Sequence, residues 1–236
     1  MTQPEPSHRL FLQWMLFAGL VSFAVWIAWA QGFLAPVFQQ DPTHLSKVIV
    51  ALFLGATGHC ALRAWFLSQQ LNEMRAIRLT GEWEGPASAH ERAPSLPAGY
   101  FHALVQKYGQ SDARHQDYQL ENAQLTQVLA EQARGPHETG WFVTGMLTKL
   151  GLIGTVIGFV LMLGSVSGME SFDVDNVQQV LQDMTVGMGV ALNTTLVGLL
   201  GSMLLGFQYL MLDRAADRLV ADAVHYAEVH LLEGVA

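Results

Sequence analysis

Four apolar stretches, separated by polar sequence, set the plan of this chain. They run over residues 10–34, 48–67, 140–168 and 184–212. At a rise of 1.5 Å per residue, about 20 helical residues cross a hydrocarbon core of about 30 Å. Each stretch is long enough, and the last contains no charged residue over its 29 positions. The pattern predicts an all-α polytopic membrane protein with four transmembrane helices and helical extensions outside the membrane.

Small and hydroxyl side chains recur at helical spacing along the last two stretches. Intervals of three and four residues place them on one face of each helix. On the first helix these are Thr144, Thr148, Gly151, Thr155, Gly158, Met162 and Ser165. On the second they are Gly187, Ala191, Thr194, Gly198 and Gly201, flanked by Thr195 and Ser202. Small residues let helices approach closely and hydroxyls bond across the interface. The pattern fits helix packing alone, and it equally fits a pathway lined by hydroxyl groups.

Acidic residues are missing from both of these stretches. None lies between Glu138 and Glu170, or between Asp183 and Asp213. A proton or cation that crosses a membrane usually needs an ionisable group on its way. If this helical hairpin lines an ion path, a partner protein must supply the acid.

Two motifs on these consecutive spans resemble a known family. Residues 151–158 read GLIGTVIG and residues 191–199 read ALNTTLVGL. They are similar to the two motifs of the MotA/TolQ/ExbB proton-channel family, and the resemblance covers about residues 140–219. It implies a homopentamer around two copies of a single-pass MotB/ExbD/TolR-like partner that carries one intramembrane Asp. It also implies a proton-motive-force-driven rotary motor, with a proton or sodium ion as the transported species and no other cofactor.

The resemblance assigns roles to individual residues. By position, Thr155 and Thr195 match the threonines that line the ion path in the family. Thr194 adds a second hydroxyl beside Thr195, and this Thr-Thr pair is similar to that of sodium-driven flagellar stators. Hydroxyl oxygens suit a hard cation, so both ions stay open. The small positions expected to serve helix packing are Gly151, Gly154, Gly158, Gly198 and Gly201.

Two departures from the family pattern bear on which branch the chain resembles. Thr148-Lys149 stands where many members have Ala-Pro, and Val190 stands where ExbB and TolQ members often have Glu. The second departure and the four-span layout favour a MotA-like protein. An ExbB/TolQ-like energiser of another process, and a non-conducting membrane scaffold, remain the alternatives.

Lysine and arginine are distributed unevenly among the polar connections. The 73–139 segment carries six, the tail after Leu212 carries two, and the 35–46 and 169–183 loops carry none. Because such residues concentrate on the cytoplasmic side, we expect an inner-membrane protein with both termini in the cytoplasm. The expected segments are a cytoplasmic N-terminus (1–9), a first transmembrane hairpin (10–72), a cytoplasmic loop and helix (73–139), the motif-bearing hairpin (140–212) and a cytoplasmic C-terminal helix (213–236).

The polar segments carry more local expectations. The second span should continue as helix to Thr80, and residues 81–99 should form a loop because of their Pro and Gly content. A helix is expected over residues 100–133, with an interruption at Gly109, and a break at Gly135-Pro136. Residues 221–232 keep helical apolar spacing and are expected to pack on the 100–133 helix or on neighbouring subunits. Lys149 is expected near the inner interface, and His59 in interhelical packing.

Composition narrows the function classes further. The chain is 51% hydrophobic and 14% charged, with a net charge of −8 and no basic block, which argues against nucleic-acid binding and for a lipid bilayer. A single cysteine, Cys60, excludes an internal disulfide and a Cys-based zinc site. The nine histidines show no metal-ligand spacing, and no phosphate-binding glycine motif is present. We therefore expect no enzymatic activity and no metal site.

Overall fold

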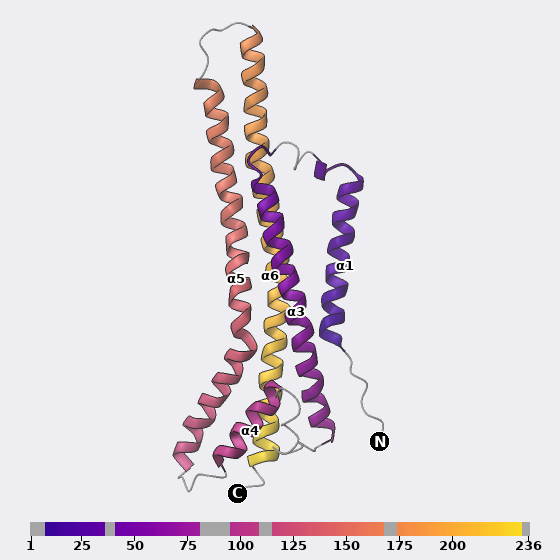
Figure 1. Cartoon of the computed structure of the whole chain (residues 1–236), viewed down its shortest axis with the longest axis vertical. Helices are drawn as coiled ribbons and strands as arrows, with labels where there is room; N and C mark the ends of the chain where they lie inside the picture. Colours follow the sequence, from indigo (N-terminus) through magenta and orange to yellow (C-terminus); the bar gives the residue numbers. More distant parts are fainter. Residues whose placement is uncertain (1–7, 36–40, 81–94, 109–114, 168–173, 233–236) are drawn as a thin grey trace. The chain divides into compact units, whose positions relative to one another are not determined.

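The computed structural model describes residues 8–35, 41–80, 95–108, 115–167 and 174–232, and every regular element in these ranges is a helix (Figure 1). The helices are α1 (Arg9–Ala30), α3 (Leu45–Thr80), α4 (Leu96–Tyr108), α5 (His115–Ser167), α6 (Val174–Tyr226) and the π-helix η1 (Ala227–Leu232). Within the described ranges, four stretches are long and apolar enough to span a membrane: Arg9–Ala30, Leu45–Leu79, Asn122–Gly164 and Val177–His230. The predicted all-α class with four spans is confirmed.

Contacts divide the chain into two compact units. We call residues 15–60 and 139–209 the apolar unit, and residues 1–14, 61–138 and 210–236 the polar unit. Helices α1, α3, α5 and α6 each contribute residues to both. The two units are described separately below.

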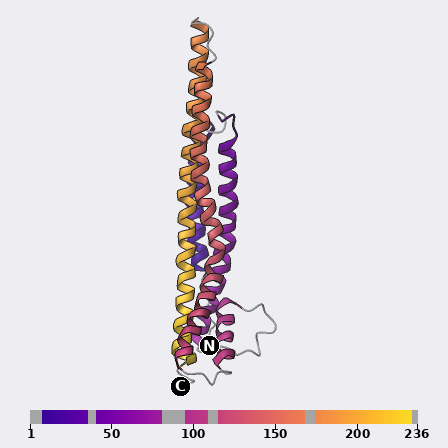
Figure 2. The same ribbon diagram turned by 90° about the vertical axis from the view of Figure 1, so that its left-hand side faces the viewer.

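Within the apolar unit, α5 and α6 form an antiparallel pair that lies side by side in both views (Figures 1 and 2). Leu147 of α5 and Val190, Leu205 and Tyr209 of α6 are fully buried. Helix α1 has no buried residue at all. Its outward Leu, Phe and Trp side chains are those of a helix that faces hydrocarbon rather than water.

A glycine just beyond its last residue terminates the first span. Gly32 has a positive φ of 78°. Its N–H donates to the carbonyl of Trp29 at 2.9 Å, and the N–H of Phe33 donates to the carbonyl of Ala28 at 3.0 Å. This pair of bonds is a Schellman cap, which satisfies the last carbonyls of the helix and favours Gly in the left-handed conformation. The cap ends α1 at Ala30, four residues before the predicted Leu34.

A buried carboxylate organises the start of α3. Asp41 Oδ1 accepts a hydrogen bond from the Thr43 N–H at 3.0 Å, and Oδ2 accepts one from the Ser46 N–H at 2.7 Å. Burial opposes ionisation of Asp41, but the hydrogen bonds from Thr43 and Ser46 outweigh it and hold the pKa below its usual value. The carboxylate thus satisfies N–H groups that the first turn of a helix leaves without an intrahelical partner.

The polar unit is built around α4 and the outer parts of α3, α5 and α6. The side chains of Phe101 and Leu104 of α4 are buried, and the Phe101 ring lies 5.3 Å from that of Tyr226. Gln70 of α3 accepts the N–H of Leu96 at 2.8 Å and so caps α4. The Phe101–Tyr226 contact confirms that the C-terminal helix packs on a helix of the 100–133 region.

Two local expectations need correction, and a third is confirmed. Residues 96–99, predicted as loop, open α4, whereas residues 81–94 lie outside the described residues. The 100–133 helix is two helices, since α4 ends at Tyr108 and α5 begins at His115; the expected interruption at Gly109 lies outside the described residues. The continuation of α3 to Thr80 is confirmed.

The predicted break at Gly135-Pro136 is wrong. Helix α5 runs through Pro136 without ending. A proline inside a helix removes one backbone donor, and neighbouring side chains often compensate. The carbonyl that Pro136 leaves without its donor is that of Gln132. Beside it, Arg63 Nη2 of α3 donates to the carbonyl of Ala133 at 3.1 Å.

Candidate functional site

The α5–α6 contact in the apolar unit is backbone against backbone. A Cβ on Gly158 would lie 2.5 Å from the Gly187 carbonyl oxygen, and one on Gly187 would lie 2.8 Å from the Gly158 oxygen. A Cβ on Gly198 would lie 2.8 Å from the Leu147 oxygen and 2.9 Å from the Gly151 Cα. Because backbone atoms cannot rotate away, any side chain at these positions would force the two helices apart.

Thr194 fills the space left by a glycine. Its side chain is fully buried, and a Cβ on Gly154 would lie 2.1 Å from Thr194 Oγ1. The hydroxyl donates to the Val190 carbonyl of its own helix at 2.8 Å. Within the described protomer, Thr194 therefore packs between the two helices. Gly201 differs from the other glycines, because its neighbours, Leu147 and Phe53, lie at ordinary van der Waals distance.

Thr195, one residue further along, bonds across the helix pair. It is half-buried, and its hydroxyl donates to the Gly151 carbonyl of α5 at 3.0 Å. Two turns along the pair, Thr148 of α5 donates to Ser202 of α6 at 2.9 Å. These two bonds join the helices through hydroxyl groups at positions where the side chains are not fully covered.

Thr155 lies at an open groove on the flank of the pair. The groove has a volume of about 510 Å³ and is lined by Thr155, Val156, Gly158, Phe159, Met162, Met188 and Ala191. The Thr155 hydroxyl donates to the Leu152 carbonyl of its own helix at 2.5 Å. A hydroxyl oxygen that donates its hydrogen keeps lone pairs for accepting. Ala191 and Thr195 are four residues apart and share a face of α6, so Thr195 lies on the same flank as the groove.

The groove is apolar apart from its threonine and contains no carboxylate. Among the described residues, no group of three or more His, Cys, Asp or Glu side chains could hold a metal ion. The charged residue in the motif-bearing part of α5 is Lys149. Its side chain is exposed in the protomer and is not buried in the helix pair. The arrangement can offer hydroxyl and carbonyl oxygens to an ion or proton, but it needs an acid from elsewhere.

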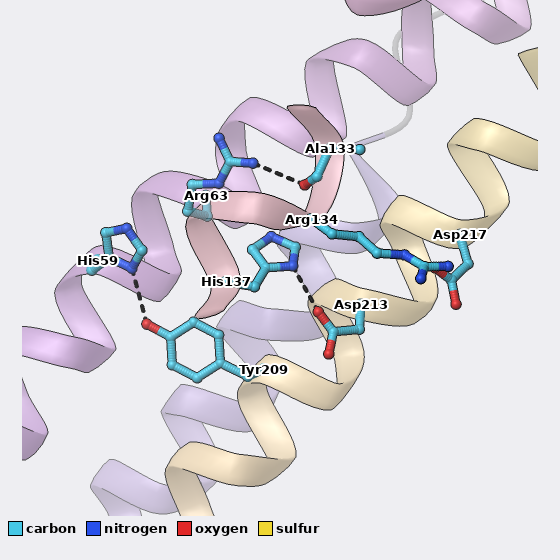
Figure 3. Close-up of polar contacts among 8 residues, drawn as sticks. All are labelled: His59, Arg63, Ala133, Arg134, His137, Tyr209, Asp213 and Asp217. Carbon is cyan, nitrogen blue, oxygen red and sulfur yellow. Dashed lines mark hydrogen bonds and ion pairs between the residues drawn. The ribbon is translucent and has the colours of Figure 1, made fainter. Parts of the chain in front are cut away.

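Within the polar unit, α5 and α6 are joined by charged side chains (Figure 3). His137 Nδ1 lies 2.7 Å from Asp213 Oδ1, and the His137 side chain is buried. One turn away, Arg134 and Asp217 form an ion pair whose side chains are about half exposed. Asp213 and Asp217 of α6 thus both pair with side chains of α5.

A second histidine contact lies within the apolar unit (Figure 3). His59 Nδ1 of α3 lies 2.9 Å from the hydroxyl of Tyr209, which also lies 3.3 Å from the Ala56 carbonyl oxygen. The Tyr209 ring occupies the space beside Gly140, where a Cβ would lie 1.9 Å from its Cζ. His59 therefore makes an interhelical contact, as expected, and does so through a hydrogen bond.

Sequence reasoning missed the His137–Asp213 pair. The histidines show no metal-ligand spacing along the chain, and the partner of His137 lies 76 residues away. The sequence did offer one signal for this pair. His137 lies just before the hairpin Gly140–Leu212 and Asp213 just after it, and the other acidic residue as near to its ends, Glu138, is exposed.

The comparisons with known proteins add one finding. No curated protein and no solved structure matches the chain. A sequence model of the MotA/TolQ/ExbB proton channel family matches residues 94–224, which is more than half of the chain and includes both motifs and the helices that carry them. It therefore confirms the family that the motifs indicate, and with four apolar helices it identifies a multi-pass membrane protein. The chain belongs to the MotA/TolQ/ExbB proton channel family.

Proposed function

We propose that this protein is the ion-channel subunit of a rotary motor driven by the proton-motive force. Five copies would surround two copies of a single-pass partner that bears an intramembrane Asp. The observation that carries this proposal is the pairing of Thr155, at an open groove, with Thr195, on the same flank of an acid-free helix pair. Membership in a proton channel family supports it.

The proposed mechanism assigns each partner one task. A proton passes Thr155 and Thr195, whose oxygens stabilise it in an apolar groove, and reaches the Asp of the partner. Neutralising that carboxylate removes the cost of moving it through an apolar region. The partner then advances past the next subunit, and the mismatch between five subunits and two partner chains turns successive steps into rotation.

The three threonines take different parts in this proposal. Thr155 and Thr195 are the path residues, because both lie on the groove flank. Thr194 was predicted to share that role, but its buried position against Gly154 favours packing instead. The proton remains the default ion. Sodium stays open, since hydroxyl and carbonyl oxygens also suit a hard cation.

The distribution of Lys and Arg supports an inner-membrane location with the polar unit in the cytoplasm. Eight of the chain's 12 Lys and Arg residues lie in the 73–139 segment and in the tail after Leu212, six and two respectively. On this basis the ends of α5 and α6 that carry His137 and Asp213 are the cytoplasmic ends.

A non-conducting scaffold is the second candidate, and a specific observation favours it. Gly158, Gly187 and Gly198 serve close helix packing, which a scaffold also needs. An ExbB/TolQ-like energiser shares the conducting mechanism and differs only in the process that it drives. Sensitivity of the function to an uncoupler separates the scaffold from both conducting candidates.

The test compares three valine variants. Thr155→Val and Thr195→Val keep the side-chain shape but remove the hydroxyl. Each should abolish uncoupler-sensitive ion flux of the complex in proteoliposomes while leaving assembly intact. Thr194→Val is the matched control, adjacent in sequence and equal in size, and should retain most of the flux. If Thr155→Val and Thr195→Val both conduct like the wild type, the path assignment is wrong.

The subunit number has its own test. Native mass spectrometry of the detergent-solubilised chain should give five copies, and five copies with two partner chains after co-expression. A monomer or dimer that ignores the partner would support the scaffold.

A further inference from the structure

The pairing of His137 with Asp213 has chemistry that the proposed path does not yet use. His137 is the buried member of the pair, with 1% of its surface exposed, whereas the Asp213 side chain is 29% exposed. A buried imidazole with a carboxylate at 2.7 Å is a common arrangement for holding one proton near neutral pH. We propose that the His137–Asp213 pair is a proton-binding station at the cytoplasmic end of the α5–α6 path, an inference that rests on the proposed function.

The position of the pair along the two helices supports this assignment. His137 precedes Thr155 by 18 residues on α5, and Asp213 follows Thr195 by 18 residues on α6. Eighteen residues make five turns and about 27 Å of helix, close to the thickness of a hydrocarbon core. On each helix, 18 residues of sequence therefore separate a member of the pair from a path threonine. No other described Asp, Glu or His lies on α5 or α6 between the pair and these threonines, except the exposed Glu138.

The chemistry of the pair is that of one reversible proton. With Asp213 ionised, His137 donates its Nδ1–H to Oδ1, which fixes the ring tautomer and makes Nε2 the basic nitrogen. On uptake a hydronium ion gives one proton to the ring: its O–H bond breaks, an N–H bond forms at Nε2, and the ring becomes an imidazolium. On release the N–H bond breaks, a water molecule accepts the proton, and the ring returns to its neutral form. The Asp213 carboxylate, 2.7 Å from Nδ1, stabilises the imidazolium.

The ion pair next to His137–Asp213 adds no net charge to its surroundings. Arg134 and Asp217 neutralise each other one turn further along α5 and α6. On α3, Arg63 donates to the Ala133 carbonyl. Glu138 and Arg214, the sequence neighbours of the pair, are exposed. Asp213 is therefore the carboxylate that directly contacts His137 (Figure 3).

The same two helices supply a matched control. Arg134–Asp217 joins α5 to α6 just as His137–Asp213 does, but its side chains are about half exposed and its cation is an arginine and not a histidine. The double variant R134Q/D217N removes an interhelical ion pair without removing a histidine. If the two pairs only hold the helices together, removing either pair should affect the protein in the same way. If His137–Asp213 binds a proton, only its removal should affect proton binding and flux.

The first experiment measures the proton directly. The full-length chain is labelled with 15N-histidine in lipid nanodiscs, and the His137 signal is identified by its loss in H137Q. We expect a Nδ1–H tautomer that converts to imidazolium as pH falls. D213N, which keeps an acceptor oxygen but removes the charge, should lower the titration midpoint by about one pH unit or more. R134Q/D217N should leave the midpoint nearly unchanged. A His137 that does not titrate between pH 4 and 9, or a midpoint insensitive to D213N, would overturn the inference.

The second experiment measures flux with a pH-sensitive dye in proteoliposomes that contain the complex with its partner. H137Q and D213N should each reduce flux at least about tenfold, as expected for removal of a proton-transfer group, and D213E should restore part of it. Full flux in H137Q and D213N, with flux lost in Thr155→Val, would refute the inference and leave the proposed function standing. If the wild-type complex shows no flux at all, the proposed function is wrong and this inference with it.

Discussion

Helices α5 and α6 are held together in two different ways along their length. In the apolar unit their backbones touch at Gly158, Gly187 and Gly198, without a charged side chain between them. In the polar unit the same helices are joined by the His137–Asp213 and Arg134–Asp217 pairs. Lipid supplies no hydrophobic force between helices, so close backbone approach must provide the contact there. In contact with water, charged side chains can form pairs that fix which positions of the two helices meet. Where one member is a histidine, the pair also contains a group that can bind a proton.

The difference bears on function. Between the helices of the apolar unit lies the hydroxyl of Thr194, which is fully buried and donates to its own helix. The hydroxyls of Thr155 and Thr195 are less covered and lie at the flank of the pair. In the polar unit the pair of helices carries titratable side chains. The two regions thus correspond to the two proposals, an ion path along the flank and a proton-binding pair in the polar unit.

The largest effect is expected from filling the backbone contact. Gly158→Ala places a Cβ within 2.6 Å of two backbone atoms of α6, so the helices must separate. We expect a loss of about 1–3 kcal/mol in the free energy of unfolding, or more, measured by denaturation in detergent.

Gly145→Ala is the control for this substitution. Gly145 lies on the same helix, and a Cβ there meets nothing within 4 Å. It should be neutral or stabilise by up to about 1 kcal/mol through helix propensity. Equal destabilisation by both variants would show that backbone contact does not hold the apolar unit.

A side-chain contact in the apolar unit should matter less than the backbone contact. Asp41→Ala removes the carboxylate at the start of α3 and should cost about 0.5–2 kcal/mol at pH 7. The pKa of Asp41 is lowered from its ordinary 3.8, so its contribution is fully present above about pH 4 and is lost as pH falls through the folded-state pKa. The difference in unfolding free energy between wild type and Asp41→Ala should therefore shrink below pH 4. A constant difference down to pH 2 would contradict the ionic origin of this contact.

The hydroxyl bond between α5 and α6 should contribute less again. A double-mutant cycle on Thr148→Val and Ser202→Ala should give a coupling energy of about 0.6 kcal/mol, as found for hydrogen bonds between membrane helices. A coupling several times larger would mean that hydroxyls, and not glycines, hold this part of the pair.

The exposed ion pair in the polar unit should have the smallest effect. Removing it with R134Q/D217N should change the unfolding free energy by no more than about 0.5 kcal/mol, and added salt should reduce the effect further. A salt-insensitive loss of several times that size would place this pair among the contacts that hold α5 to α6.

Much of the fold could be predicted from the sequence, because apolar runs of 20 or more residues report spans directly. The continuity of α5 could not be predicted, because a proline by itself indicates the end of a helix. The contact from Arg63 to Ala133, beside the proline, joins residues 70 positions apart. Local pattern carries no information about such a contact.

The sequence identified the motifs of the candidate site, but not the direction in which each of their side chains points. Thr194 and Thr195 fit the motif equally, but a rotation of about 100° per residue turns one hydroxyl toward Gly154 and the other toward the Gly151 carbonyl. The His137–Asp213 pair was not predictable because it depends on the register of two helices.

The central claim is that this chain supplies the oxygens of an ion path and a partner supplies its acid. The most direct measurement is proton flux into proteoliposomes that contain the chain alone, the chain with its single-pass partner, or the chain with a partner whose intramembrane Asp is replaced by Asn. We predict flux only in the second case. Flux through the chain alone, or flux that survives the loss of the partner's carboxylate, would contradict the account.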